Sequence, residues 1–133
     1  MISITQLYGK VTNIHFFRWF RIIVFEMSAT CIFIYGVLSS QYLLPPSPLP
    51  DPYTPINNPI HSFFISCCLF LILCYSGQLT GGHCNPAVTL SLLITKGNKI
   101  TPLVFVVYAL SQFAGALLGG LIAWPLVTDF NFQ

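Results

Sequence analysis

The sequence predicts an all-α membrane protein with three transmembrane helices and one re-entrant half-helix. Three observations lead to this fold class. First, 55% of the 133 residues are hydrophobic and only 6% are charged, whereas a soluble domain carries about 25% charged residues. Second, three apolar runs are long enough to cross a bilayer as helices, which takes roughly 20 residues each. Third, the stretch TGGHCNPAVTLSLL places glycines, an asparagine and a proline among apolar residues.

Residues 1–21 form a mixed, aromatic segment that ends in HFFRWFR. Aromatic and basic side chains collect at the membrane surface, so this segment predicts a cytoplasmic, interfacial N-terminus with Trp19 and Arg21 at headgroup level. The apolar run that follows is too long for the hydrophobic part of a signal peptide. It predicts a first span at 22–42.

The remaining spans are set off by helix-breaking residues. Prolines recur from Pro45 to Pro59, which excludes a helix and predicts an extended surface loop. A second span is expected at 60–76. After the KGNK turn, a third span is expected at 103–124, followed by an extracytoplasmic tail at 125–133.

The charges predict the orientation. If the chain crosses three times, every Lys and Arg falls on one side, and Asp51 and Asp129 lie on the other. The positive-inside rule then places the N-terminus in the cytoplasm and the C-terminus outside. This topology requires 77–96 to begin and end on the cytoplasmic side and to dip into the membrane as a re-entrant loop. Irregular backbone at that depth is tolerated only inside protein or beside a water-filled cavity.

The re-entrant loop carries the chemistry. Asn85 suits a helix N-cap and Pro86 suits the first helical position. A helix of ~10 residues rises about 15 Å, half the hydrocarbon core, so its N-terminus would lie near the midplane. Free N–H groups and a partial positive charge at that end repel cations and favour hydrogen-bond acceptors. Water is the obvious ligand, and a small polyol or urea is the next.

The same residues resemble a known family. GGHCNPAVTL, residues 81–90, is similar to the first signature motif of the major intrinsic proteins, the aquaporins and aquaglyceroporins, with Thr80 at the family's serine position. Glu26 and Thr30 resemble the family's E-x-x-x-T pattern in its first helix. YALSQFAGALLGG resembles a third-helix pattern, in which Gln112 follows a serine instead of an alanine. The resemblance implies one aquaporin-like repeat, the first of two.

The resemblance also implies roles for individual residues. The pore motif is expected at Asn85, Pro86 and Ala87, and the loop backbone that lines the pore is expected at Gly82, His83 and Cys84. Glu26 and Gln112 are expected to brace the loop, and Ile65 falls where the family places an outer filter residue. Three alternatives stay open: a proton-relay role for Glu26, a packing role for His83, and mercurial sensitivity at Cys84.

The predicted function is a passive channel for water and/or small neutral solutes such as glycerol or urea, with the half-helix excluding ions and protons. The expected partners are the lipid bilayer and, for a full-length protein, three further copies in a homotetramer. The chain has one Asn-Pro-Ala, so the alternative is a truncated, non-conducting half-channel that needs or binds a partner chain. An ion-coupled transporter would need more charges in its spans. Nothing predicts an enzyme, a cofactor, a metal site or nucleic-acid binding, and the cysteines are expected to pack as small apolar residues.

Overall fold

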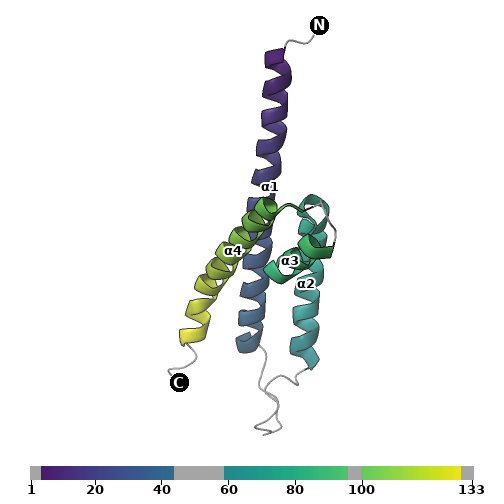
Figure 1. Cartoon of the computed structure of the whole chain (residues 1–133). Coiled ribbons are helices and arrows are strands. Elements are labelled where there is room, and N and C mark those ends of the chain that lie inside the picture. Colours follow the sequence, from purple (N-terminus) through teal and green to yellow (C-terminus); the bar gives the residue numbers. More distant parts are fainter. Residues whose placement is uncertain (1–3, 44–58, 96–99, 130–133) are drawn as a thin grey trace.

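The computed structural model describes residues 4–43, 59–95 and 100–129, and the side chains of 16–40, 61–95 and 100–126. The described residues form the α-helices α1 (Ile4–Leu43), α2 (Pro59–Thr80), α3 (Pro86–Thr95) and α4 (Pro102–Asp129). Three of these helices have candidate membrane spans, at Phe16–Ser40, His61–Thr80 and Pro102–Leu126, and α3 is a shorter apolar helix. The predicted fold class is confirmed. The start of α1 and the end of α4 lie at opposite ends of the bundle (Figure 1).

Several boundaries differ from the expected ones. α1 is one continuous helix from Ile4, so the segment expected to lie at the interface runs into the first span without a break. α2 continues to Thr80 instead of ending at 76, and hydroxyl groups in its last turns bond back to carbonyls one turn earlier. α4 passes through Pro125 to Asp129, where a tail was expected; a proline is tolerated in a membrane helix. The proline-rich loop and the KGNK turn lie outside the described residues.

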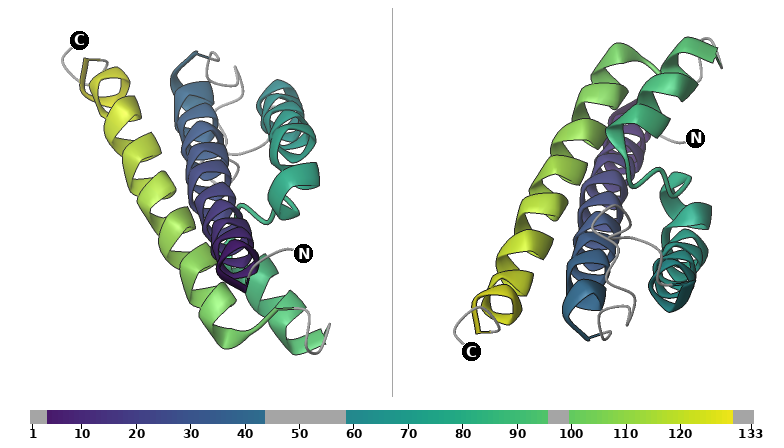
Figure 2. Two further views of the ribbon diagram at one scale, coloured as in Figure 1. Left: turned by 90° about the horizontal axis from the view of Figure 1, so that it is seen from above. Right: turned by 90° about the horizontal axis from the view of Figure 1, so that it is seen from below.

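α1 lies between α2 and α4 (Figures 1 and 2). α1 and α4 run in the same direction, and α2 runs in the opposite one. Gly115 and Gly119 set the closest approach, because a Cβ atom on either would collide with the α1 backbone at Met27 or Cys31. By sequence, the small residues of the GALLGG segment, residues 115–120, suit close helix packing either within the chain or between chains. These two glycines face α1, whereas Gly120 has open space beside it.

The segment between α2 and α4 re-enters the bundle. Ile100, just before α4, packs on the cluster that contains Ile22 of α1. Cys84 packs in a second cluster with Ala29 and Ile72. Ala29 lies seven residues beyond Ile22, which is about 10 Å further along α1. The chain therefore descends after Thr80, begins α3 near the depth of Ala29, and returns along α3, as the re-entrant prediction requires.

Candidate functional site

Glu26, within the α1 span, is the centre of the site. Its side chain is fully buried, and its carboxylate accepts four hydrogen bonds. Oε1 accepts from Thr80 Oγ1 at 2.6 Å and from the His83 N–H at 3.2 Å. Oε2 accepts from the Cys84 N–H and from Gln112 Nε2, both at 2.8 Å. We call Glu26 and these four donors the loop anchor.

The loop anchor explains why a carboxylate is tolerated inside a span. Burying an isolated charge is very costly, and proteins compensate with paired charges or hydrogen bonds. Among the described side chains Glu26 is the only acidic one, and its four donors come from α2, the loop and α4. One carboxylate therefore joins α1 to the end of α2, to the loop that follows it and to α4, at sequence separations of 54 to 86 residues.

The loop backbone needs special conformations to reach Glu26. Gly81 and Gly82 have φ angles of 97° and 62°, and Cys84 has a φ of 48°. A Cβ atom on Gly82 would come within 3.1 Å of the Gly77 Cα, so glycine is required there for close approach as well. A left-handed conformation costs a non-glycine residue roughly 1–2 kcal/mol. At Cys84 the hydrogen bond from its N–H to the buried carboxylate offsets that cost.

Asn85 and Pro86 form the start of α3 as the sequence predicts. Asn85 Oδ1 accepts a hydrogen bond from the Ala87 N–H at 2.9 Å, and the Asn85 carbonyl accepts one from the Thr89 N–H at 3.1 Å. This is the geometry of an N-cap. Asn85 and Ala87 are exposed, whereas Thr89 is buried. The capped end of α3 therefore opens to one side of the chain.

A second layer of contacts holds the loop from α4. Gln112 Nε2 also donates to Thr89 Oγ1 at 3.2 Å, and His83 Nδ1 lies 3.1 Å from the same oxygen. The Thr89 hydroxyl also donates to the Asn85 carbonyl at 3.2 Å. When the hydroxyl proton points to that carbonyl, His83 Nδ1 must be the donor in its contact with Thr89 Oγ1. His83 therefore packs inside the loop and stacks on Tyr108 with ring centroids 4.6 Å apart.

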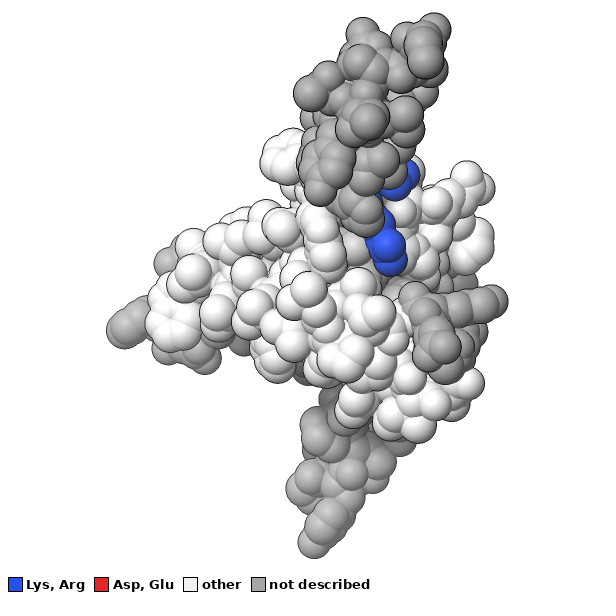
Figure 3. All heavy atoms as spheres, turned by 45° about the horizontal axis from the view of Figure 1, so that its top comes forward, with Lys and Arg blue, Asp and Glu red and all other residues white. Residues whose placement is uncertain are grey.

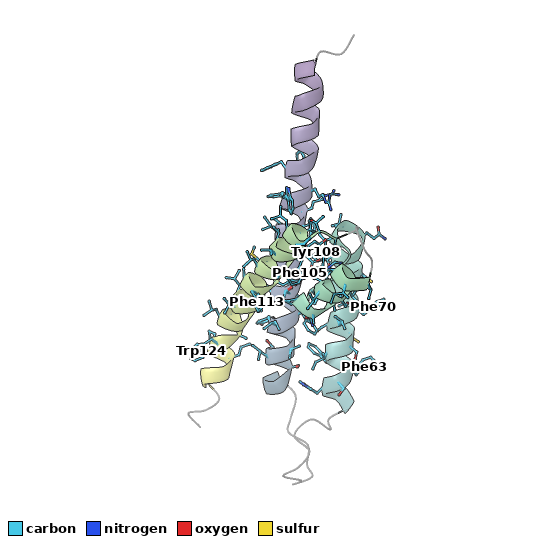
Figure 4. All side chains as sticks on the ribbon, viewed as in Figure 1. Phe63, Phe70, Phe105, Tyr108, Phe113 and Trp124 are labelled. Atoms are coloured by element: carbon cyan, nitrogen blue, oxygen red, sulfur yellow. The ribbon has the colours of Figure 1, made fainter. Side chains whose placement is uncertain are left out.

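Tyr108 lies where α4 passes α1 and the loop (Figure 4). Its hydroxyl donates to the Thr80 carbonyl at 2.5 Å, which satisfies one of the free carbonyl groups at the end of α2. The sequence reasoning did not assign a role to Tyr108 or to Thr89. The spacing of these residues could have signalled a role. Tyr108 lies four residues before Gln112, and Thr89 lies four residues after Asn85, so each falls on the same side of its helix as a predicted site residue.

Ile65 lies apart from the loop anchor. It is half-buried in the first part of α2, seven residues before Ile72, which packs against Cys84. That separation is about 10 Å along the helix axis, toward the end of the bundle opposite the loop. Its neighbours Phe63 and Phe64 are exposed. In the described part of the chain, no three His, Cys, Asp or Glu side chains come together as metal ligands would.

Three helices long and apolar enough to cross a membrane, with a short re-entrant helix beside α4 and its loop anchored on a buried carboxylate, define a multi-pass membrane protein. Comparison with known proteins gives the family. The family described as Major intrinsic protein matches residues 11–129. The chain therefore belongs to the major intrinsic protein family, whose members are membrane channels for water or small solutes.

Individual relatives agree with this assignment. Aquaporin-5 of Rattus norvegicus is 36% identical over 107 residues, which are 80% of this chain and 37% of the relative. The probable aquaporin PIP2-5 of Arabidopsis thaliana is 28% identical over 112 residues, which are 81% of this chain and 38% of the relative. The chain thus spans less than two fifths of the length of these relatives. No solved structure matches it significantly.

Proposed function

We propose that this chain forms one repeat of a passive channel for water and/or small neutral solutes such as glycerol or urea. The observation that carries the proposal is Asn85 at the exposed start of α3. Because Asn85 Oδ1 caps the Ala87 N–H, its amide Nδ2 is the group left to donate to a solute. Gly82, His83 and Cys84 lead into this position and would offer backbone carbonyls along the same path.

The half-helix gives the proposed pore its selectivity against ions. The N-terminus of a helix carries roughly half a positive charge. Glu26, the only acidic side chain in the described part of the chain, is buried and turned to its four donors. A cation or a proton near Asn85 would thus meet a positive helix end with no exposed carboxylate to balance it. A neutral hydrogen-bond acceptor meets no such barrier.

The exposure of the α3 start also bears on what completes the pore. Asn85, Ala87 and Val88 are exposed, so a further membrane segment must cover them to enclose a pathway. In our proposal that segment comes either from a longer protein containing this repeat, assembled as a homotetramer, or from a partner chain that binds this half. The proposed orientation places the N-terminus in the cytoplasm.

A chimera tests the proposal. The matched 107-residue region of rat aquaporin-5 is replaced by the corresponding part of this chain, and the chimera is reconstituted in vesicles. Stopped-flow light scattering then measures water, glycerol and urea permeability. We expect permeability several times that of empty vesicles for at least one solute. Proton flux should stay at the level of empty vesicles.

Two variants make the result specific. Asn85→Leu should lower the permeability of the chimera about fivefold to tenfold, since a lost hydrogen bond of ~1 kcal/mol corresponds to a factor of about five. Ser66→Ala, which removes only a local, exposed hydrogen bond in α2, should leave it unchanged. A correctly assembled chimera that conducts no solute would contradict the proposal. Conduction by the 133-residue chain alone would contradict the version that requires a further segment.

A further inference from the structure

A basic and aromatic surface covers one side of α1 at the start of its span. Its members are all exposed: Phe16, Phe17, Arg18, Phe20 and Arg21. At 100° per residue, the three phenylalanines occupy one arc of the helix and the two arginines occupy the arc beside it. The rings contact one another, with centroids 6.1 Å apart for Phe16 and Phe17 and 6.3 Å apart for Phe16 and Phe20. We call these five residues the basic-aromatic surface.

The opposite side of the same turns is fixed against α4. Ile22 is buried with Val104 and Tyr108, and Trp19 packs on this cluster. The helix therefore cannot rotate to bury the basic-aromatic surface without breaking that cluster. Nothing in the described part of the chain covers this surface.

The length of α1 places this surface at the headgroup layer. The α1 span from Phe16 to Ser40 rises about 36 Å, which exceeds the ~30 Å hydrocarbon core, so with Ser40 at one boundary the other boundary falls near Arg21. α4 gives the same boundary, since Ile100 and Val104 at its start pack beside Trp19 and Ile22. Arginine side chains in helices lean toward the N-terminus, so both guanidinium groups reach outward to the level of lipid phosphates. Phenylalanines on one face of an interfacial helix enter the boundary between headgroups and acyl chains.

The charge of this surface is uncompensated within the described part of the chain. The one acidic side chain described, Glu26, is buried. Figure 3 shows the described basic side chains together beside the N-terminal part of the chain, with no acidic side chain on that face. Two guanidinium groups at i and i+3 lie close together on the helix surface and present donors that fit phosphate oxygens.

We infer that the basic-aromatic surface binds an anionic phospholipid, with its phosphate between Arg18 and Arg21 and with the three phenylalanines inserted beside it in the interfacial layer. Depth and composition together select a lipid. A soluble acidic partner would have to displace headgroups to reach arginines at this level, and it would gain nothing from rings that already sit in the interface.

The two tryptophans of the chain make this testable. Trp19 lies beside the surface, and Trp124 lies in the last turns of the α4 span. The full chain with Trp124→Phe reports on Trp19 alone, and the full chain with Trp19→Phe reports on Trp124 alone. Each is reconstituted in vesicles that contain acyl-brominated phosphatidylcholine or acyl-brominated phosphatidylglycerol. Fluorescence quenching as a function of the brominated fraction gives the relative association of each lipid.

Phosphatidylglycerol should associate near Trp19 several-fold more strongly than phosphatidylcholine, and Trp124 should show no preference. A basic residue near a charged surface contributes about a fivefold change. Arg18→Gln with Arg21→Gln should therefore abolish the preference, whereas Arg18→Lys with Arg21→Lys should keep most of it. Circular dichroism and Trp124-only quenching serve as controls for folding. Equal association of both lipids near Trp19, a preference that survives the double Gln variant, or an equal preference at Trp124 would overturn the inference.

Discussion

The loop anchor and the outer side of α2 differ in how they are stabilised. Around Glu26, a fully buried side chain, the contacts are polar and either buried or part-buried, and they join four segments of the chain. On α2 the large side chains Phe63, Phe70 and Leu71 are between 65% and 71% exposed, and its span is 11% buried compared with 28% for the α1 and α4 spans. Figure 4 labels Phe63 and Phe70 on α2, and it labels Tyr108 of α4, whose hydroxyl bonds to the carbonyl of Thr80 in the loop anchor.

This difference shows where the sequence specifies the structure. Lipid solvates apolar side chains as well as protein does, so the outer side of α2 gains little from any particular neighbour. Unsatisfied polar groups are costly in that medium, so the loop anchor has one arrangement in which its donors and acceptors are paired. Substitutions in the two regions should therefore differ strongly in effect.

Glu26→Ala should have the largest effect. It removes the acceptor of the His83 and Cys84 N–H groups and one of the two acceptors of the Gln112 amide, at about 1–3 kcal/mol for each buried group. We expect the unfolding free energy to fall by about 3 kcal/mol, measured by SDS titration followed by circular dichroism. Ser66→Ala on α2 is the matched control and should change stability by less than about 0.5 kcal/mol. Similar effects for the two variants would contradict the comparison.

Gly115→Val should come next, because its side chain would collide with the α1 backbone at Met27. Overpacking of this kind costs about 1–3 kcal/mol, and the same SDS titration measures it. Gly120→Ala provides the control within the same helix, since nothing lies near the added methyl group. The idea that the close contact of α1 and α4 depends on Gly115 fails if the two variants are equally stable.

Tyr108→Phe should have a moderate effect. The ring stack on His83 remains, but the Thr80 carbonyl loses its hydrogen bond. Interhelical hydrogen bonds in membranes contribute about 0.6 kcal/mol on average, and we expect a loss of about 1 kcal/mol. Thermal unfolding in detergent would measure it. A loss above that of Glu26→Ala would place the centre of the site at Tyr108 instead.

Tyr75→Phe should have the smallest effect. The Tyr75 hydroxyl lies 3.3 Å from Ser28 Oγ in an exposed contact between α2 and α1, and Ser28 Oγ also lies 3.3 Å from the Phe25 carbonyl. We expect a change below about 0.5 kcal/mol in the same thermal unfolding experiment. A loss as large as that of Tyr108→Phe would show that α2 also depends on specific polar contacts.

The sequence was sufficient to predict the fold class, because the length of each apolar run predicts a membrane-spanning helix. It also placed Glu26, Gln112 and the Asn85 cap in one site by resemblance, and the structure brings Glu26 and Gln112 within 2.8 Å of each other. Hydrophobic length could not locate the end of α2, because Gly77 suggests a break while the Ser76 and Thr80 hydroxyls bond back along the helix. It could not locate the end of α4 either, because Pro125 does not stop the helix.

The tertiary partners of the motif were beyond sequence reasoning. Thr80 stood out as a departure from the family's serine, yet its hydroxyl makes the shortest bond to Glu26, at 2.6 Å. Tyr108 lies 28 residues from Thr80, and no periodic pattern links positions so far apart. Such contacts depend on how close α4 comes to α1. Gly115 and Gly119 set that distance by packing against the α1 backbone, and no local sequence pattern reports it.

The central claim is that Glu26 holds the re-entrant loop in place, and the reactivity of Cys84 tests it most directly. In a chain whose other four cysteines are replaced by alanine, the buried Cys84 thiol should react slowly with a small alkylating reagent. Glu26→Ala should raise the alkylation rate at least tenfold, because the loop loses its acceptor, and Ser66→Ala should not change it. Equal rates for the parent chain and Glu26→Ala, with the helices intact by circular dichroism, would contradict the account.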